Sequence, residues 1–165
     1  MKTLKGTLSN TFGGCLTIRG TAPFSEIVAL SVPKEYQRET LPDHLLDIEE
    51  FYARGETVFF PEVILSLELQ YDFNADDASV LNGDPTNHIL KGGKFKSNVD
   101  RITVTPTKSG TAAVSIPDDV KPFGRIDGNH RLSAKNSSAA LTEEIPFCIV
   151  LFTTSKITKN EKSLF

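Results

Sequence analysis

Apolar side chains recur at every second position over much of Phe59–Leu69. The apolar face carries Val63, Leu65, Leu67 and Leu69, and Ser66 and Glu68 lie on the other face. A period of two is typical of a β-strand that turns one face toward a core. This segment is the clearest strand that the sequence predicts.

A helical period precedes this strand. Thr40 supplies a capping hydroxyl, Pro42 fits the first turn, and Asp43 places a negative charge near the positive end of the helix dipole. The apolar positions at helical spacing are Leu41, Leu45, Ile48 and Tyr52. Gly55 suits the left-handed residue that closes a helix. We therefore expect a helix between Thr40 and Gly55.

Short β-leaning stretches, separated by turn formers, open the chain. They are Leu4–Leu8, Cys15–Ile18 and Ile27–Val32. We expect three small strands at the edge of a sheet.

The second half of the chain predicts further strands. Arg101–Thr105 and Thr111–Ile116 flank a turn in which Gly110 can adopt a positive φ, which predicts a β-hairpin. Phe123–Ile126 indicates a third strand that leads through a turn into a short helix. Pro146–Phe152 is almost uniformly apolar, as in a strand covered on both faces.

Two segments lie outside this pattern. Residues 72–100 are polar and rich in turn formers, and we expect an insertion that hangs off the core as a loop or short hairpin. Thr158 and Glu161 have the spacing of a capping box, so we expect the natural protein to continue into a further helix. The mixed order of strands and helices predicts an α+β fold with a mixed sheet, in one domain over residues 1–165.

Composition and charge exclude several classes of protein. The 165 residues carry 18 Lys and Arg against 21 Asp and Glu, a formal charge of −3, so the whole chain is not a basic nucleic-acid coat. The longest apolar run, Phe147–Phe152, is far shorter than the roughly 20 residues that span a membrane, and the start of the chain lacks the apolar core of a signal peptide. We expect a soluble cytoplasmic protein without a membrane partner. Cys15 and Cys148 are too few for a disulfide scaffold, so we expect buried structural thiols.

Candidate chemistry concentrates in GRIDGNHRL, residues 124–132. The first backbone N–H groups of a helix have no partner within it and attract anions. Gly128 would let a ligand approach the backbone, and Arg131 could bind a phosphate through two parallel hydrogen bonds. His130 could donate one more, while Asp127 could hold a metal ion, orient His130 or accept a proton. The segment therefore predicts a phosphate site at a strand–turn–helix junction.

A purely structural explanation of the same residues stays open. Asp127 would cap the helix, His130 would be a surface or half-buried residue, and Arg131 would pair with a nearby acid. Short motifs of this kind also occur without any ligand.

IDGNHRL resembles the signature of DGQHR-domain proteins, which belong to the ParB/sulfiredoxin-like superfamily. The resemblance covers most of the chain from about residue 33. Four other segments follow the order of that family: YQR at residues 36–38, FFPEVI at 59–64, IPFCIVLF at 145–152 and TKNEKSLF at 158–165.

Two departures from the family pattern bear on the chemistry. Asn129 stands in place of the Gln of DGQHR and is a shorter amide with the same donors and acceptors. Sulfiredoxins carry a reactive Cys in the equivalent turn, whereas no Cys lies between Gly124 and Leu132. Sulfiredoxin-type reduction is therefore excluded, because the thiolate nucleophile is missing.

The resemblance implies a ParB/sulfiredoxin-like fold with a nucleotide site on the turn, because ParB-like proteins bind CTP and sulfiredoxins bind ATP. Carried onto this chain, it implies ATP or CTP with Mg²⁺ as the cofactor and Asp127 as the residue that holds the metal ion. The implied catalytic residues are Asp127, His130 and Arg131. The implied nucleotide contacts are Gly128, Asn129, His130 and Arg131, with Gln37 and Arg38 across the cleft.

DGQHR proteins, among them DndB of DNA phosphorothioation and DpdB of deazaguanine modification, are associated with DNA modification and phage defence. Some members are thought to hydrolyse ATP. The resemblance therefore implies a nucleotide-binding domain of such a system, with nucleoside triphosphate hydrolysis as its activity if it is an enzyme.

Two other functions stay open. His130, Arg131 and a basic loop at residues 91–101, part of a wider local basic excess, could contact a DNA backbone, in which case the chain is a non-enzymatic DNA-binding transcriptional regulator. The basic residues are Lys91, Lys94, Lys96, Arg101 and Lys108. Some ParB-like enzymes phosphorylate a free amino acid from a similar Asp-Gly turn, and Glu62 would then be the base of a small-molecule kinase.

Overall fold

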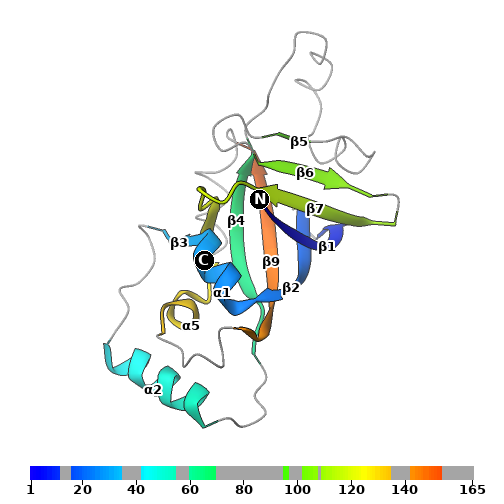
Figure 1. The fold of residues 1–165 in the computed structure, drawn as a ribbon. Coiled ribbons are helices and arrows are strands. Elements are labelled where there is room, and N and C mark those ends of the chain that lie inside the picture. The colour runs from blue at the N-terminus through cyan, green and yellow to red at the C-terminus, as the bar shows by residue number, and fades with distance from the viewer. Residues whose placement is uncertain are drawn as a thin grey trace, which may run out of the picture.

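The computed structural model shows a mixed α+β protein with one curled sheet and a few short helices (Figure 1). The structure describes residues 1–11, 16–34, 42–54, 60–69, 95–96, 102–107, 109–134 and 142–153. The strands are β1 (Lys2–Asn10), β2 (Leu16–Pro23), β3 (Ser31–Pro33), β4 (Val63–Leu69), β5 (Phe95–Lys96), β6 (Thr103–Pro106), β7 (Thr111–Ile116), β8 (Phe123–Asp127) and β9 (Glu144–Thr153). The helices are α1 (Phe24–Leu30), α2 (Pro42–Ala53) and α5 (Asn129–Ser133).

The strands form one sheet in the order β3-β8-β4-β9-β2-β1-β7-β6-β5. β3 runs parallel to β8, and β4 runs parallel to β9. The other neighbours are antiparallel, so the sheet is mixed, as the sequence predicts. β1 and β2 lie inside the sheet, between β7 and β9, and their expected place at an edge is therefore wrong.

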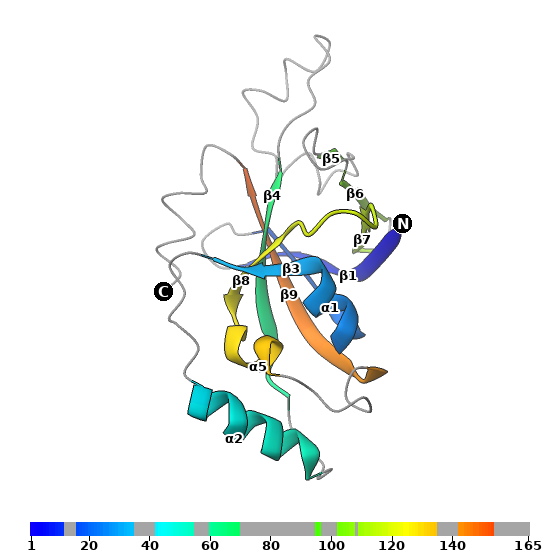
Figure 2. The same ribbon diagram turned by 60° about the vertical axis from the view of Figure 1, so that its left-hand side comes forward.

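One face of the sheet carries the main hydrophobic core. Alternate residues of a strand point to the same face, and those of β1, β2, β4, β7 and β9 supply most of the core. Ile27 of α1 and Leu132 of α5 pack into this core and are almost fully buried. Figure 2 shows α1 and α5 side by side on this face. The short helix after β8 is thus fixed to the sheet by its own buried leucine.

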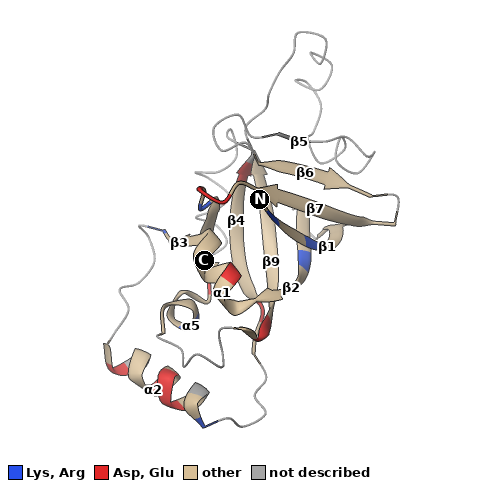
Figure 3. Cartoon of the chain, viewed as in Figure 1, with Lys and Arg blue, Asp and Glu red and all other residues tan. Residues whose placement is uncertain are grey.

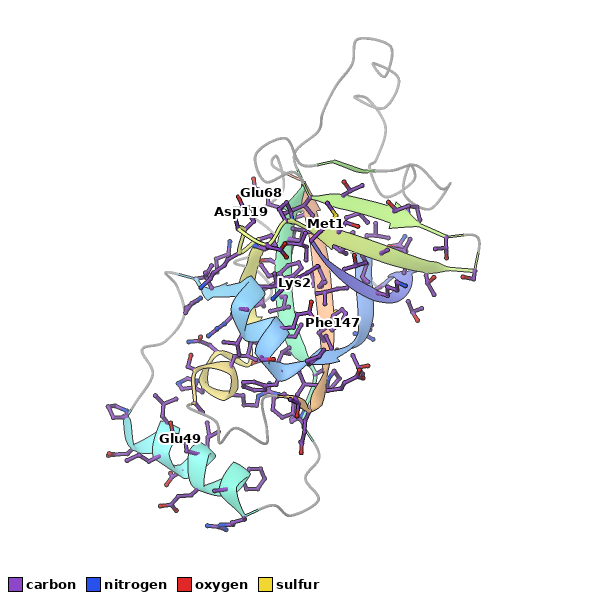
Figure 4. The ribbon with its side chains drawn as sticks, in the orientation of Figure 1. Met1, Lys2, Glu49, Glu68, Asp119 and Phe147 are labelled. Atoms are coloured by element: carbon purple, nitrogen blue, oxygen red, sulfur yellow. The ribbon has the colours of Figure 1, made fainter. Side chains whose placement is uncertain are left out.

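β9 is buried on both faces, which confirms the prediction from its uniformly apolar sequence. Phe147, labelled in Figure 4, and Ile149 point into the main core. Cys148 and Val150 belong to a second buried cluster on the opposite face, together with Ile126 of β8. A strand near the middle of a sheet needs apolar side chains in both directions, which explains the absence of alternation there.

α2 confirms the predicted helix between Thr40 and Gly55, although these two flanking residues lie outside the described part of the chain. It lies apart from the sheet and packs on α5 (Figures 1 and 2). None of the α2 side chains that the structure describes is buried, and Leu46 and Phe51 are 57% and 42% exposed. Its acidic residues are coloured red in Figure 3.

The strand expected at Ile27–Val32 is wrong, because most of that segment belongs to α1. Phe24, Ile27 and Leu30 are three positions apart and all buried, so they form one face of a helical turn against the sheet. The β-branched residues of the segment favour a strand locally, but burial of this helical face overrides that weak preference.

The remaining strands agree with the sequence. β6 and β7 form the predicted antiparallel hairpin, and Gly110 has a φ of 75°. β4, β8 and the start of α5 also lie where the sequence predicts them. Apart from β5, the insertion at 72–100 lies outside the described residues, as does the capping box at 158–161. Within the described part, every helix is too short or too polar to cross a bilayer.

Candidate functional site

The candidate site begins with a β-bulge at the end of β8. Arg125 pairs with Leu65 of β4, whereas Asp127 pairs with Ile64, so Ile126 is an extra residue on β8. A bulge bends the strand and changes the direction of the following side chains, and bulges are common beside functional sites. The regular alternation of side chains between the two faces of the sheet therefore ends at this bulge, just before the turn.

Gly128 forms the turn between β8 and α5. Its φ of 85° and ψ of 13° lie in the left-handed region that glycine adopts without strain. A Cβ at this position would lie 2.7 Å from Cγ1 of Val63 and 3.3 Å from Nη2 of Arg131. Gly128 is buried, so the space that the sequence analysis assigns to an approaching ligand is filled by Val63 and Arg131.

α5 begins without a side-chain cap. Gly128 occupies the N-cap position, and no side chain caps the helix there. The structural explanation in which Asp127 caps α5 is therefore wrong. The last turn is closed by backbone bonds, from the N–H of Leu132 to the carbonyl of Gly128 and from the N–H of Ala134 to that of His130.

Asn129 belongs to a buried polar network around Arg125. The Nη1 group of Arg125 donates to Oδ1 of Asn129 at 3.1 Å and to Oγ of Ser133 at 3.0 Å, and its Nε donates to Oγ of Ser31 at 3.0 Å. Arg125 is 5% exposed, and this burial lowers the pKa of its guanidinium. An arginine nevertheless stays protonated in proteins. Arg125 thus joins β3, β8 and α5.

Arg131 is held at the surface of the same turn. Its Nη2 lies 3.2 Å from Oδ2 of Asp127, four residues earlier in the chain. Its Nη1 donates to the main-chain carbonyl of Pro61. Its guanidinium carbon lies 5.3 Å from the ring centroid of Phe60, and that ring packs edge-to-face on Phe24.

These contacts bring together three of the predicted site residues. Asp127 and Arg131 form an ion pair, and His130 is half-buried beside Arg131 on α5. Pairing of Arg131 with an acid is the structural explanation given above, and the geometry shows that contact. The side chain of Arg131 is 20% exposed and that of Asp127 is 63% exposed, so the pair faces solvent.

Glu62, the candidate base of the kinase alternative, pairs with another cation. Its Oε1 lies 3.5 Å from Nε of Arg19 on β2. A hydrogen bond to Cys148, followed by the charge of Glu62, raises the pKa of Arg19. Burial raises the pKa of the Cys148 thiol, which confirms that this cysteine is a buried structural thiol.

Most of the other predicted site residues lie outside the described part of the chain. These are Gln37 and Arg38, and, in the basic segment, Lys91, Lys94 and Arg101. Lys96 belongs to β5. Cys15 is also outside.

The described residues contain no group of three or more His, Cys, Asp or Glu side chains that could hold a metal ion. Asp127 offers one carboxylate beside the turn, and its side chain is exposed. A protein-built metal cage therefore does not fit this part of the chain. One carboxylate fits only a Mg²⁺ ion whose remaining ligands are water and substrate phosphates.

No protein-family model matches the chain, and no curated protein or solved structure matches it.

Sequence reasoning missed the residues that fix the site. Arg125 lies within the charged segment, and a lone Arg in a short apolar strand was the signal that it is buried and bonded. In the sequence, Phe60 and Pro61 have significance only as part of the segment that resembles the DGQHR family. Their contact with Arg131 spans about 70 positions and has no signal in local sequence.

Proposed function

We propose that this chain binds the phosphate groups of a nucleotide at the junction of β8 and α5, with Arg131 as the principal phosphate ligand. One observation carries this proposal. The Arg131 guanidinium is fixed by the Pro61 carbonyl and the Phe60 ring while its side chain keeps solvent access. A fixed guanidinium loses little conformational freedom when it binds a phosphate.

The side chains, rather than the helix amides, support the proposal. α5 has five residues, and Gly128 and Asn129 at its start are buried. Arg131 has five N–H donors, of which the contacts with Asp127 and Pro61 use two. A phosphate can accept from the donor that pairs with Asp127 together with the donors that these two contacts leave, and His130 is the adjacent candidate for a further bond. Asn129 then acts indirectly, by holding α5 on Arg125.

The wider role proposed here is that of a DGQHR-type, ParB/sulfiredoxin-like domain in a DNA-modification or phage-defence system. The IDGNHRL motif and the order of its flanking segments support this role. ATP or CTP with Mg²⁺ is the proposed ligand, and Asp127 supplies an exposed carboxylate near the turn. Hydrolysis is a further step that would place Arg131 and His130 on the transferring phosphoryl group.

A thermal-shift panel tests this proposal. ATP, ADP, CTP and GTP, each with magnesium, are added to the wild type, to Arg131→Ala and to Arg54→Ala. Arg54 is an exposed arginine next to α2 and serves as the control for the loss of one positive charge. A ligand at 100-fold over its Kd stabilises the folded state by about 2.7 kcal/mol, which corresponds to roughly 5–10 °C in Tm for a chain of this size.

We expect at least one nucleotide to raise the Tm of the wild type and of Arg54→Ala, and not that of Arg131→Ala. An equal shift in all three proteins would place the nucleotide elsewhere. No shift with any nucleotide, together with tight and strongly salt-dependent DNA binding, would instead support the DNA-binding regulator.

A further inference from the structure

The three contacts of Arg131 differ in how easily a ligand can displace them. The Pro61 carbonyl is part of the main chain, and the Phe60 ring is packed against Phe24 at a centroid distance of 6.3 Å. Asp127, in contrast, contacts Arg131 through a side chain that is 63% exposed. Asp127 is therefore the one partner of this guanidinium that can turn away into solvent without repacking the core.

Asp127 also occupies the place where an anion would bind. Its Oδ2 lies 3.2 Å from Nη2 of Arg131, the distance at which a phosphate oxygen would accept the same N–H. Nη1 of the guanidinium is directed to the Pro61 carbonyl, and Nη2 lies 3.3 Å from the position that a Cβ would take at Gly128. An incoming oxyanion therefore meets the carboxylate of Asp127 first.

We infer that Asp127 is an internal competitor for Arg131, which must be displaced before a phosphate binds. This inference rests on the proposed phosphate site and gives Asp127 a regulatory role in place of a catalytic one. A competitor lowers the apparent affinity of every anion by the same factor. Anions that bind Arg131 weakly, such as chloride and simple carboxylates, are then weakened further, whereas diphosphate and triphosphate groups bind strongly enough to displace the carboxylate.

The expected size of the effect follows from the exposure of the pair. Solvent-exposed ion pairs, including those four residues apart on a helix, are weak. Removing such a competitor should raise the affinity for a phosphate about 2- to 5-fold.

The test measures the binding of inorganic phosphate and pyrophosphate by isothermal titration calorimetry, at pH 8, at low ionic strength and without divalent metal. The variants are Asp127→Asn, which keeps the shape of the side chain, and Asp127→Ala, which removes the contact altogether. Asp47→Asn, on the exposed side of α2, is the control with the same change in formal charge. Arg131→Ala removes the proposed phosphate ligand, so its titration measures any binding elsewhere on the protein. Far-UV circular dichroism and Tm verify that each variant is folded.

We expect both Asp127 variants to bind pyrophosphate about 2- to 5-fold more tightly than the wild type, with Asp47→Asn unchanged. Unchanged or weaker binding by both variants, while the wild type binds and Arg131→Ala does not, would overturn the competitor role and leave the proposed function standing. An equal gain in Asp47→Asn would also overturn it, since the gain would then come from net charge. Absence of binding to the wild type and to both Asp127 variants would overturn the competitor role and the phosphate site together.

Discussion

Two glycines with left-handed backbone differ in what surrounds them. Gly110 has a φ of 75° and no atom within 4 Å of the position of a Cβ, whereas Gly128 has a φ of 85° and Val63 at 2.7 Å. The backbone conformation alone costs an L-residue about 1–2 kcal/mol. The contact with Val63 adds a steric cost only at Gly128. The pair therefore separates conformational strain from crowding at the candidate site.

Gly110→Ala should lower the free energy of unfolding by about 1 kcal/mol, and Gly128→Ala by roughly 2–4 kcal/mol. Urea titration of both variants measures the difference. Adding Val63→Ala to Gly128→Ala should recover part of the loss, which a double-mutant cycle reports as a coupling free energy. Equal destabilisation by the two glycine variants would contradict the steric role of Val63.

Cys148 makes a second residue-scale prediction, on pH. Burial raises the pKa of its thiol in the folded state above the ordinary value of about 9.0. The unfolded chain therefore releases this proton first as the pH rises, and the folded state loses relative stability from about pH 9 up to the folded pKa. Below about pH 9 the thiol is protonated in both states, and its full contribution to the stability of the folded state is present. The loss attributable to this thiol is at most about 1.4 kcal/mol per pH unit.

Unfolding free energies at pH 7.5, 8.5, 9.5 and 10.5 test the sign. The wild type should lose stability more steeply above pH 9 than Cys148→Ala, in which the thiol is missing. The comparison uses slopes, because the alanine variant also loses packing at every pH. Parallel slopes would show that the thiol titrates alike in both states.

At the scale of elements, the arrangement of β3, β8 and α5 depends on one buried side chain. Arg125 donates to Ser31 after α1, to Asn129 at the start of α5 and to Ser133 at its end. A helix of five residues cannot be stable on its own, because nucleation costs more than so few bonds return. Its position therefore depends on this network and on the buried Leu132.

Arg125→Met should lower the free energy of unfolding by about 2–4 kcal/mol, because it removes three hydrogen bonds from a buried polar network. Arg19→Met is the matched control. Arg19 is 55% exposed and forms an ion pair of the weak surface kind, so its loss should cost about 0.5 kcal/mol or less. Comparable losses in the two variants would contradict the structural role of the Arg125 network.

Among the described helices, α2 should be the one least protected from hydrogen exchange. Its described side chains are exposed or half-buried. It packs on another short helix, α5, rather than on the sheet. Hydrogen exchange at pH 7 should therefore be fast for residues 42–53 and slow for β2 and β9, which lie at the centre of the sheet. Protection of α2 equal to that of β9 would show that the helix is held by contacts beyond these.

For the whole molecule, the main core links nearly all parts of the described chain. Its buried residues come from strands on both sides of β9 and from α1 and α5. Cooperative unfolding is expected when one continuous core joins the elements. The sheet, α1 and α5 should consequently unfold in a single transition.

Scanning calorimetry measures this cooperativity. The calorimetric enthalpy should equal the van 't Hoff enthalpy. The unfolding enthalpy should be about 0.7 kcal/mol per residue at 60 °C. Two resolved transitions, or a van 't Hoff enthalpy well below the calorimetric one, would mean that the core is divided into independent units.

The sequence by itself determined the features that depend on neighbouring residues. The period of two in β4, the helical period in α2, the glycine turn of the β6–β7 hairpin and the strand–turn–helix at residues 123–133 were all predictable. Each is a consequence of local backbone geometry or of a repeating apolar position, which a short window of sequence contains.

The tertiary structure alone decided the rest. α1 is a helix because its three-residue apolar spacing fits against the sheet, and β1 and β2 are interior strands because distant segments pair with them. The residues that fix the site, Ser31 on Arg125 and Pro61 on Arg131, lie 94 and 70 positions from their partners. Contacts over such separations depend on the packing of the whole sheet, so no local pattern specifies them.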